Sequence, residues 1–330
     1  MTHITRRRFL SATAAGAIAS AAGFALAPKR KALVAITLDL EMSAEYPKRG
    51  MTEWNYRKGD LDADTKRYAV NAARVAKDRG GLIHFFAVGR TLEQADVGWL
   101  KELAAAGHPV GNHTYDHVNV KAAKPDDVQF RFKRAPWLIR DKPVAGVIEE
   151  NIALTTAALK ERCGITPAGF RTPGGFHNGL KDRSDLQKML LKQGFTWASS
   201  LYPAHRSGTP KERPGDEVYA DIVRAQAAAQ PFVYPSGLVE VPMNPISDVT
   251  AFRARYWRLD WFLKAVRLAV QEVVRTGGCF DFLAHPSCLV VEDPTFETVK
   301  LICDLVKDAG DKAAVVGLDT MAHRGRENKN

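Results

Sequence analysis

Two histidines and two carboxylates stand at spacings that could hold a metal ion. His113 and His117 are four positions apart, and on one face of a helix such a pair can direct ring nitrogens to one ion. Asp39 and Glu41 close an apolar run, and alternate residues of a strand face the same way. Alone, the histidines could be ordinary core or surface residues. With the carboxylates, they predict a site for a divalent metal ion.

The pattern after residue 31 alternates apolar runs with stretches of helical spacing. The expected strands are 32–40, 82–88, 108–113, 168–171, 195–200, 238–242, 279–284 and 313–318. The expected helices are 65–77, 92–106, 144–162, 182–193, 259–275 and 294–309. This alternation predicts an α/β fold, a distorted (β/α) barrel of seven or eight units. Three long loops, 42–64, 118–143 and 201–237, follow strand ends and should form its catalytic face.

Composition narrows the class of protein. The chain has 330 residues, 45% of them hydrophobic and 25% charged, which is ordinary for a soluble globular protein. The net charge of +10 would suit an anionic polymer as partner, or it could serve solubility alone. No basic run is interleaved with aromatic residues, so nucleic acid is not an expected partner. The four cysteines lack metal-site spacing and are expected as free thiols, although a Cys279–Cys288 disulfide stays open.

The first 27 residues look like an export signal. Arg6, Arg7 and Arg8 precede a short run without charge, which is typical of a twin-arginine signal peptide over 1–27. A disordered basic tail is the alternative. The signal predicts a periplasmic or extracellular protein that meets a membrane only during export. A catalytic domain is expected over 32–322, followed by a disordered tail over 323–330.

The motifs resemble those of the polysaccharide deacetylase family, the NodB homology domain of carbohydrate esterase family 4. That family's second motif, His-Ser/Thr-x-x-His, is matched by 113–117. Its third motif begins Arg-x-Pro and is matched by 171–175, and its last, Leu-x-His, by 283–285. The matches come in family order and span residues 34 to 285. The resemblance thus covers nearly all of the expected catalytic domain.

The resemblance implies a hydrolytic metal centre. A divalent ion, with Zn²⁺ the expected one, would be held by His113, His117 and Glu41. An open position on the ion would accept water and the acetyl carbonyl. Asp39 would act as the base that takes a proton from this water.

The same resemblance assigns the remaining machinery. Arg171 would orient the base, and the backbone N–H of Gly174 would stabilise the oxyanion together with the metal. His285 would protonate the leaving amine. Trp197 and Leu283 would enclose the acetyl methyl group, although plain core packing explains these two almost as well.

Two departures from the family pattern leave questions open. The usual first motif has two adjacent aspartates, but here Leu40 takes the second position and Glu41 follows. The base and ligand roles of Asp39 and Glu41 could therefore be exchanged. The fourth motif normally brings an aspartate near Trp197, where this chain has none. Either another acid replaces it, or His285 titrates differently.

The expected function is removal of N- or O-linked acetyl groups from a glycan such as peptidoglycan or a chitin-like polymer. This makes the chain a hydrolase acting on carbon–nitrogen bonds other than peptide bonds. One alternative keeps the site but changes the substrate to small linear or cyclic amides. Another is a catalytically degenerate domain that binds sugar. The sequence carries no signal for an oligomeric state.

Overall fold

The computed structural model describes residues 30–51 and 53–327 of the chain. The expected signal peptide over 1–27 lies outside these residues. Within the described residues, no helix combines the length and apolar character needed to cross a membrane. Cys163, Cys279, Cys288 and Cys303 are all free, as the lack of a pairing pattern predicted.

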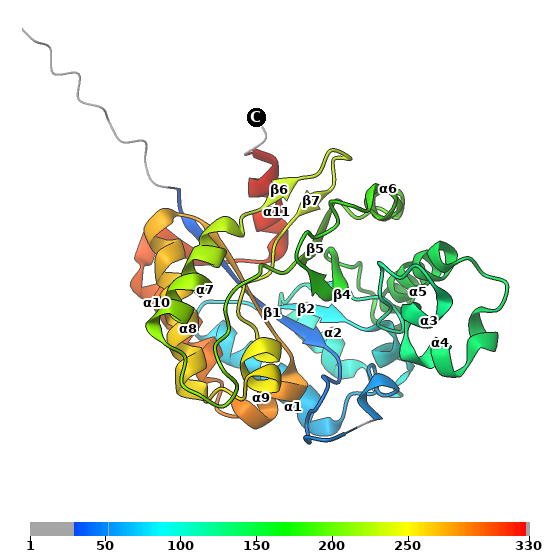
Figure 1. Ribbon diagram of the computed structural model, residues 1–330, viewed down its shortest axis with the longest axis horizontal. Helices are drawn as coiled ribbons and strands as arrows, with labels where there is room; N and C mark the ends of the chain where they lie inside the picture. Colours follow the sequence, from blue (N-terminus) through cyan, green and yellow to red (C-terminus); the bar gives the residue numbers. More distant parts are fainter. Residues whose placement is uncertain (1–29, 52, 328–330) are drawn as a thin grey trace, which may run out of the picture.

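A nine-stranded sheet forms the centre of the fold (Figure 1). Its strands are β1 (Ala32–Leu40), β2 (His84–Ala87), β3 (Val110–Asn112), β4 (Phe170–Phe176), β5 (Trp197–Leu201), β6 (Phe232–Val233), β7 (Val239–Glu240), β8 (Cys279–Ala284) and β9 (Ala313–Val315). The order is β6-β7-β5-β4-β3-β2-β1-β8, with β9 beside the start of β1. Every pair is parallel except β6 with β7. The sheet curls into a half-barrel, which confirms the predicted fold class.

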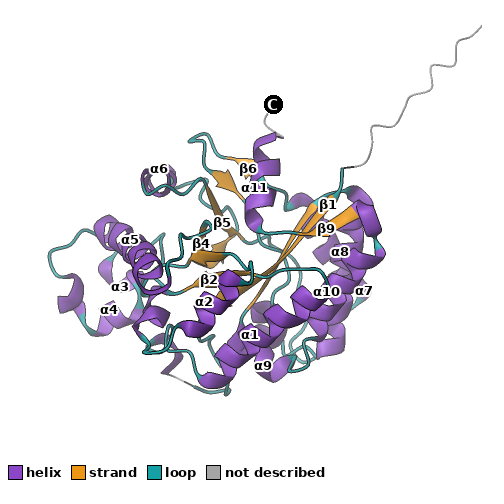
Figure 2. Cartoon of the chain, turned by 180° about the vertical axis from the view of Figure 1, so that it is seen from behind, coloured by secondary structure: helices purple, strands orange, loops and turns teal. Residues whose placement is uncertain are grey.

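Helices surround the curled sheet (Figure 2). They are α1 (Ala63–Asp78), α2 (Gly98–Ala105), α3 (Pro125–Val128), α4 (Phe130–Arg134), α5 (Val144–Cys163), α6 (Ser184–Lys192), α7 (Asp216–Ala228), α8 (Leu259–Thr276), α9 (Pro286–Glu292), α10 (Glu297–Asp308) and α11 (Leu318–Glu327). Short 3₁₀ turns lie at Glu53–Asn55, Gly89–Glu93, Pro136–Ile139 and Gly310–Lys312, and a π-helical turn at Val249–Ala254. The loops 118–143 and 201–237, expected to be irregular, thus contain the helices α3, α4 and α7.

β1 is the axis of the arrangement. All nine of its residues are buried, as expected of a central parallel strand that is covered on both faces. One edge pairs with β8, and the other pairs first with β9 and then with β2. α8 and α10 pack beside each other against this region. The carboxyl end of β1 is therefore fixed from several sides, which suits a strand that ends in functional side chains.

The interior of the curl is filled at its amino-terminal end by apolar side chains. These include Phe86 and Trp197 from the sheet, together with Leu318, Met321 and Ala322 from α11. The prediction of a disordered tail from residue 323 is therefore wrong up to Glu327, because α11 continues to that residue and closes this core. The apolar layer forms a floor beneath the polar groups described next.

Candidate active site

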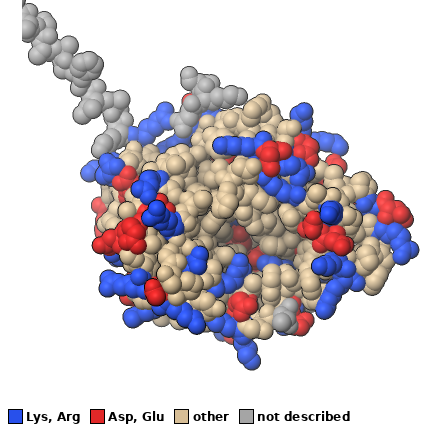
Figure 3. Space-filling view, in the orientation of Figure 1, with Lys and Arg blue, Asp and Glu red and all other residues tan. Residues whose placement is uncertain are grey.

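The carboxyl ends of the parallel strands meet at one cavity of about 310 Å³. Asp39 is the last but one residue of β1 and Glu41 directly follows this strand, whereas His113 follows β3 and His285 follows β8. These residues line the cavity together, as expected for strand ends in an α/β barrel. In Figure 3 the same face of the molecule is hollowed near its centre, with acidic atoms inside and basic atoms nearby.

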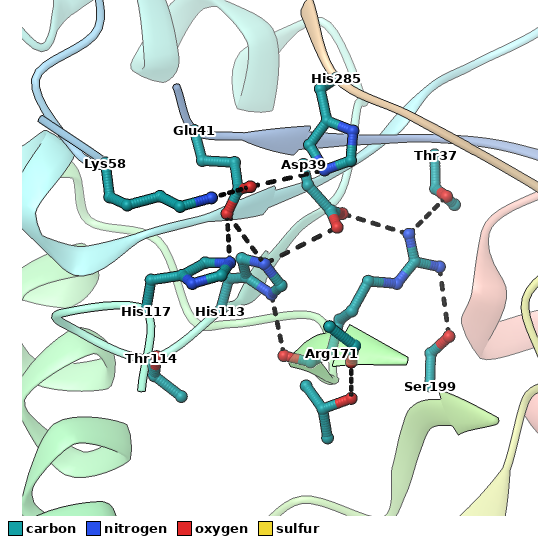
Figure 4. A network of polar contacts seen from close by, with 12 residues as sticks. Thr37, Asp39, Glu41, Lys58, His113, Thr114, His117, Arg171, Ser199 and His285 are labelled. Carbon is teal, nitrogen blue, oxygen red and sulfur yellow. Dashed lines mark hydrogen bonds and ion pairs between the residues drawn. The ribbon is translucent and has the colours of Figure 1, made fainter. Parts of the chain in front are cut away.

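The two histidines converge from a loop, not from a helix as predicted. Residues 113–117 follow β3 without helical structure, and Thr114 and His117 have left-handed backbone angles of φ +60° and +58°. Asn112 accepts a hydrogen bond from the Thr114 N–H at 2.9 Å, which fixes this turn. The rings lie 5.1 Å apart between centroids and both face Glu41 (Figure 4). The two ring nitrogens therefore converge as the spacing suggested, but a turn brings them together and not a helix.

Glu41 Oε2 is the point on which the histidines converge. It lies 2.5 Å from His117 Nε2 and 3.4 Å from His113 Nε2, yet it has no partner with hydrogen-bond geometry. His113 Nδ1 lies 3.0 Å from the Arg171 carbonyl oxygen, which can only accept, so Nδ1 carries the proton and Nε2 turns its lone pair to the site. One carboxylate oxygen and two imidazole nitrogens thus share a single centre.

Lys58, which the sequence reading missed, is the fourth group at this centre. Its ammonium nitrogen lies 2.5 Å from Glu41 Oε1 and is buried. Burial alone would raise the pKa of Glu41, but His117 and Lys58 hold it well below its ordinary value. Burial lowers the pKa of His117 to about 4 against the attraction of Glu41. Glu41 is therefore ionised and His117 neutral at pH 7, the forms in which each can bind a metal ion.

Asp39 is held from the side opposite the histidine loop. Its Oδ1 accepts from Arg171 Nη1 at 3.2 Å, and its Oδ2 lies 3.7 Å from His113 Nε2. The Arg171 guanidinium is fully buried and also binds Asp281, Thr37 and, at 3.2 Å, Ser199. Arg171 is therefore shared between two carboxylates, and its orientation is fixed by hydrogen bonds from three strands.

His285 has an acidic partner that the sequence did not reveal. Its Nδ1 donates to Asp248 Oδ1 at 3.0 Å, and its backbone N–H donates to Asp248 Oδ2 at 2.8 Å. Its Nε2 faces the cavity, 3.5 Å from Glu41 Oε1. Burial would lower the pKa of His285, but the Asp248 carboxylate outweighs it and raises the pKa. Asp248 precedes the π-helical turn 249–254, so the acid missing near Trp197 is supplied by another segment.

Gly174 and Leu283 both line the cavity, whereas Trp197 does not. Gly174 lies at an irregularity of β4, with φ +72° and open space where a Cβ would stand, so its glycine serves the backbone conformation. Trp197 begins β5, one layer below the site, and packs at an edge against Phe86. The prediction that Trp197 encloses the acetyl methyl group is therefore corrected. Its indole N–H instead donates to Asp319 at 2.9 Å.

Comparisons with known proteins identify one family model. Residues 59–191 match the family model described as polysaccharide deacetylase. This segment includes the histidine loop and the Arg171 motif, whereas Asp39, Glu41 and His285 lie outside it. A search of curated proteins finds no match.

Solved structures show the same fold. A Mycobacterium smegmatis protein described as a predicted polysaccharide deacetylase superimposes with a TM-score of 0.60 at 18% identity, covering 92% of this chain and 93% of its own. A predicted glycoside hydrolase/deacetylase from Parabacteroides distasonis gives a TM-score of 0.51 at 10% identity, covering 91% of this chain and 72% of its own. With the family model matched over residues 59–191 and the fold shared, the chain resembles the polysaccharide deacetylases, which are hydrolases.

Proposed function

We propose that this protein removes acetyl groups from an acetylated polysaccharide, with a divalent metal ion held by Glu41, His113 and His117. The observation that carries the proposal is one cavity that this triad shares with Asp39 and His285. Arg171 binds the carboxylate of Asp39, and Asp248 binds the imidazole of His285. A base and an acid beside one centre are what hydrolysis of an amide requires.

The residues present fit a metal ion. Glu41 Oε2 is a buried oxygen without a hydrogen-bond partner, and the lone pair of His113 Nε2 is directed at it. Two imidazoles and one carboxylate are a donor set that suits Zn²⁺ in catalytic sites. When bound, such an ion would act as a Lewis acid that polarises the acetyl carbonyl. The closer approach of Glu41 to both histidines supports Glu41 as the ligand and Asp39 as the base.

The protein's own groups perform the proton transfers. Asp39 takes a proton from the water that attacks the acetyl carbonyl carbon, and the hydrogen bond from Arg171 orients this carboxylate. His285 gives a proton to the nitrogen as the carbon–nitrogen bond breaks, so acetate and a free amine leave. Asp248 holds the His285 Nδ1–H and so leaves Nε2 as the atom that faces the substrate.

A second hollow next to the cavity favours a polymer over a small amide. It measures about 280 Å³ and shares Trp54, His117 and Gly174 with the first. Asp127 and Phe130 line its far part, which offers a carboxylate and an aromatic ring to a neighbouring sugar. A single small amide would leave this hollow unused. The export signal predicted over 1–27 would place such an enzyme outside the cytoplasm, where cell-wall glycans lie.

Acetate release tests the proposal. The purified protein, loaded with Zn²⁺, is assayed on chito-oligosaccharides, peptidoglycan and small linear and cyclic amides. We expect acetate from at least one glycan, and loss of that activity in Asp39→Asn with metal retained. Activity confined to the small amides would move the function to that class. Release from none of the substrates would contradict the proposal and leave a sugar-binding domain.

A further inference from the structure

One cation on the cavity wall lacks an acidic partner. Arg253 lies in the π-helical turn 249–254 and lines the cavity, partly buried. Its one hydrogen bond among the described residues runs from Nη1 to Ser43 Oγ at 3.4 Å. No carboxylate of residues 30–51 or 53–327 forms an ion pair with it. The other two cations at the site are matched, Lys58 with Glu41 and Arg171 with two aspartates.

The surroundings of Arg253 make an unpaired guanidinium costly. Lys58 is close enough that the positive charge of Arg253 helps to lower its pKa, after burial. A partly desolvated cation beside a second cation is stabilised when an anion enters. A guanidinium also presents a planar pair of N–H donors that match a carboxylate. The wall therefore has an unused site for an anionic group of the ligand.

The position of Arg253 indicates where on the substrate this group would lie. The same turn follows Asp248, which holds His285, the group that protonates the leaving nitrogen. Arg253 thus belongs to the wall on the leaving-group side of the cavity. An anion bound there would be carried by the sugar that keeps the nitrogen, and would not belong to the departing acetate.

We propose that Arg253 binds a carboxylate on the acetylated sugar, which makes the preferred substrate an acidic glycan. The inference rests on the proposed deacetylase function and names its substrate class. Two sources share the chemistry: a sugar with a lactyl ether, as in N-acetylmuramic acid, and an acetylated uronic acid.

The test compares acidic and neutral substrates in matched variants. Rates of acetate release are measured for glycan strands containing N-acetylmuramic acid, for an acetylated polyuronate and for neutral chito-oligosaccharides of equal length. In Arg253→Gln we expect kcat/KM to fall about ten- to a hundredfold on an acidic substrate, the range typical of a charge-assisted hydrogen bond. On a neutral substrate kcat/KM should change by less than about threefold, because such a substrate has no carboxylate to bind Arg253. Which acidic substrate responds identifies the source of the carboxylate.

Arg255→Gln is the control. Arg255 directly follows the same turn, but its Nε donates to Ser207 at 2.7 Å and it does not line the cavity. This variant should keep the wild-type preference. An equal loss on acidic and neutral substrates in Arg253→Gln, or no loss on either, would overturn the inference.

Binding of free N-acetylmuramic acid and N-acetylglucosamine to the metal-free protein separates this inference from the proposed function. We expect tighter binding of the acid, with the difference lost in Arg253→Gln. That result without any acetate release would contradict the deacetylase function but keep the acidic site. Acetate release with no preference for the acid would keep the deacetylase function but contradict the acidic site.

Discussion

Neutralising Asp248 should change how the enzyme responds to pH. Asp248→Asn keeps the size of the side chain and an oxygen that can accept from the His285 N–H groups, but it removes the buried charge. That charge raises the pKa of His285. In the variant this pKa falls, so the acid form of His285 is lost at a lower pH. The alkaline limb of the pH–rate profile should therefore move toward lower pH.

The size of the effect follows from the contact. A hydrogen bond to a charged group contributes about 1.5–3 kcal/mol, and about 1.4 kcal/mol corresponds to a tenfold change in rate. On the alkaline limb, kcat/KM should therefore fall by about ten- to a hundredfold. The loss should shrink as the pH is lowered, because His285 regains its proton there.

Acetate release measured across the pH range checks this prediction. Asp216→Asn is the control, because the Asp216 side chain is 97% exposed and lies in α7, away from the cavity. Its profile should match the wild type. Metal content and thermal unfolding of both variants show whether the site is intact. An alkaline limb that stays in place in an active Asp248→Asn protein would refute the role given to this carboxylate.

Three further predictions concern stability. Lys58→Met leaves the buried Glu41 charge without its cation, so the free energy of unfolding of the metal-free protein should fall by about 3–5 kcal/mol. Denaturant titrations measure this loss, and added Zn²⁺ should restore most of it. Burial raises the pKa of Asp281 from 3.8 to about 6 despite the attraction of Arg171. Between these two pH values the folded protein holds a proton that the unfolded chain has lost. The free energy of unfolding should therefore fall as the pH rises through this window. In Asp281→Asn that fall should be smaller. Gly174→Ala should cost about 1–2 kcal/mol through its left-handed backbone, measured by thermal unfolding.

The sequence predicted the fold class because its signals are local. An apolar run such as 32–40 and a helix ended by Gly164 or Gly277 are visible in a window of a few residues. α11 was not predicted, because its polar composition resembles that of a disordered tail. Its few apolar residues are stabilising only where they pack into the interior of the curl, which the sequence does not show. α7 escaped for a similar reason within a long connection.

Site residues could likewise be predicted only where the sequence signal is local. Those carried by spaced motifs, such as His113 and His117, could be named from sequence, although their turn could not. Lys58 and Asp248 could not be named, because each meets its partner across a long sequence separation and neither belongs to a recognisable spacing. Trp197 was misplaced, because the pattern identifies the strand but not the layer of the curl in which its side chain lies.

Titration calorimetry of Zn²⁺ binding to the metal-free protein tests the central claim, the metal centre, most directly. Three ligands that converge on one centre predict saturation at about one ion per chain, with release of protons as expected for such sites. His113→Ala should abolish this binding, whereas Asp39→Asn should keep it. Tight binding that persists in His113→Ala, or no binding by the wild type, would contradict the metal centre.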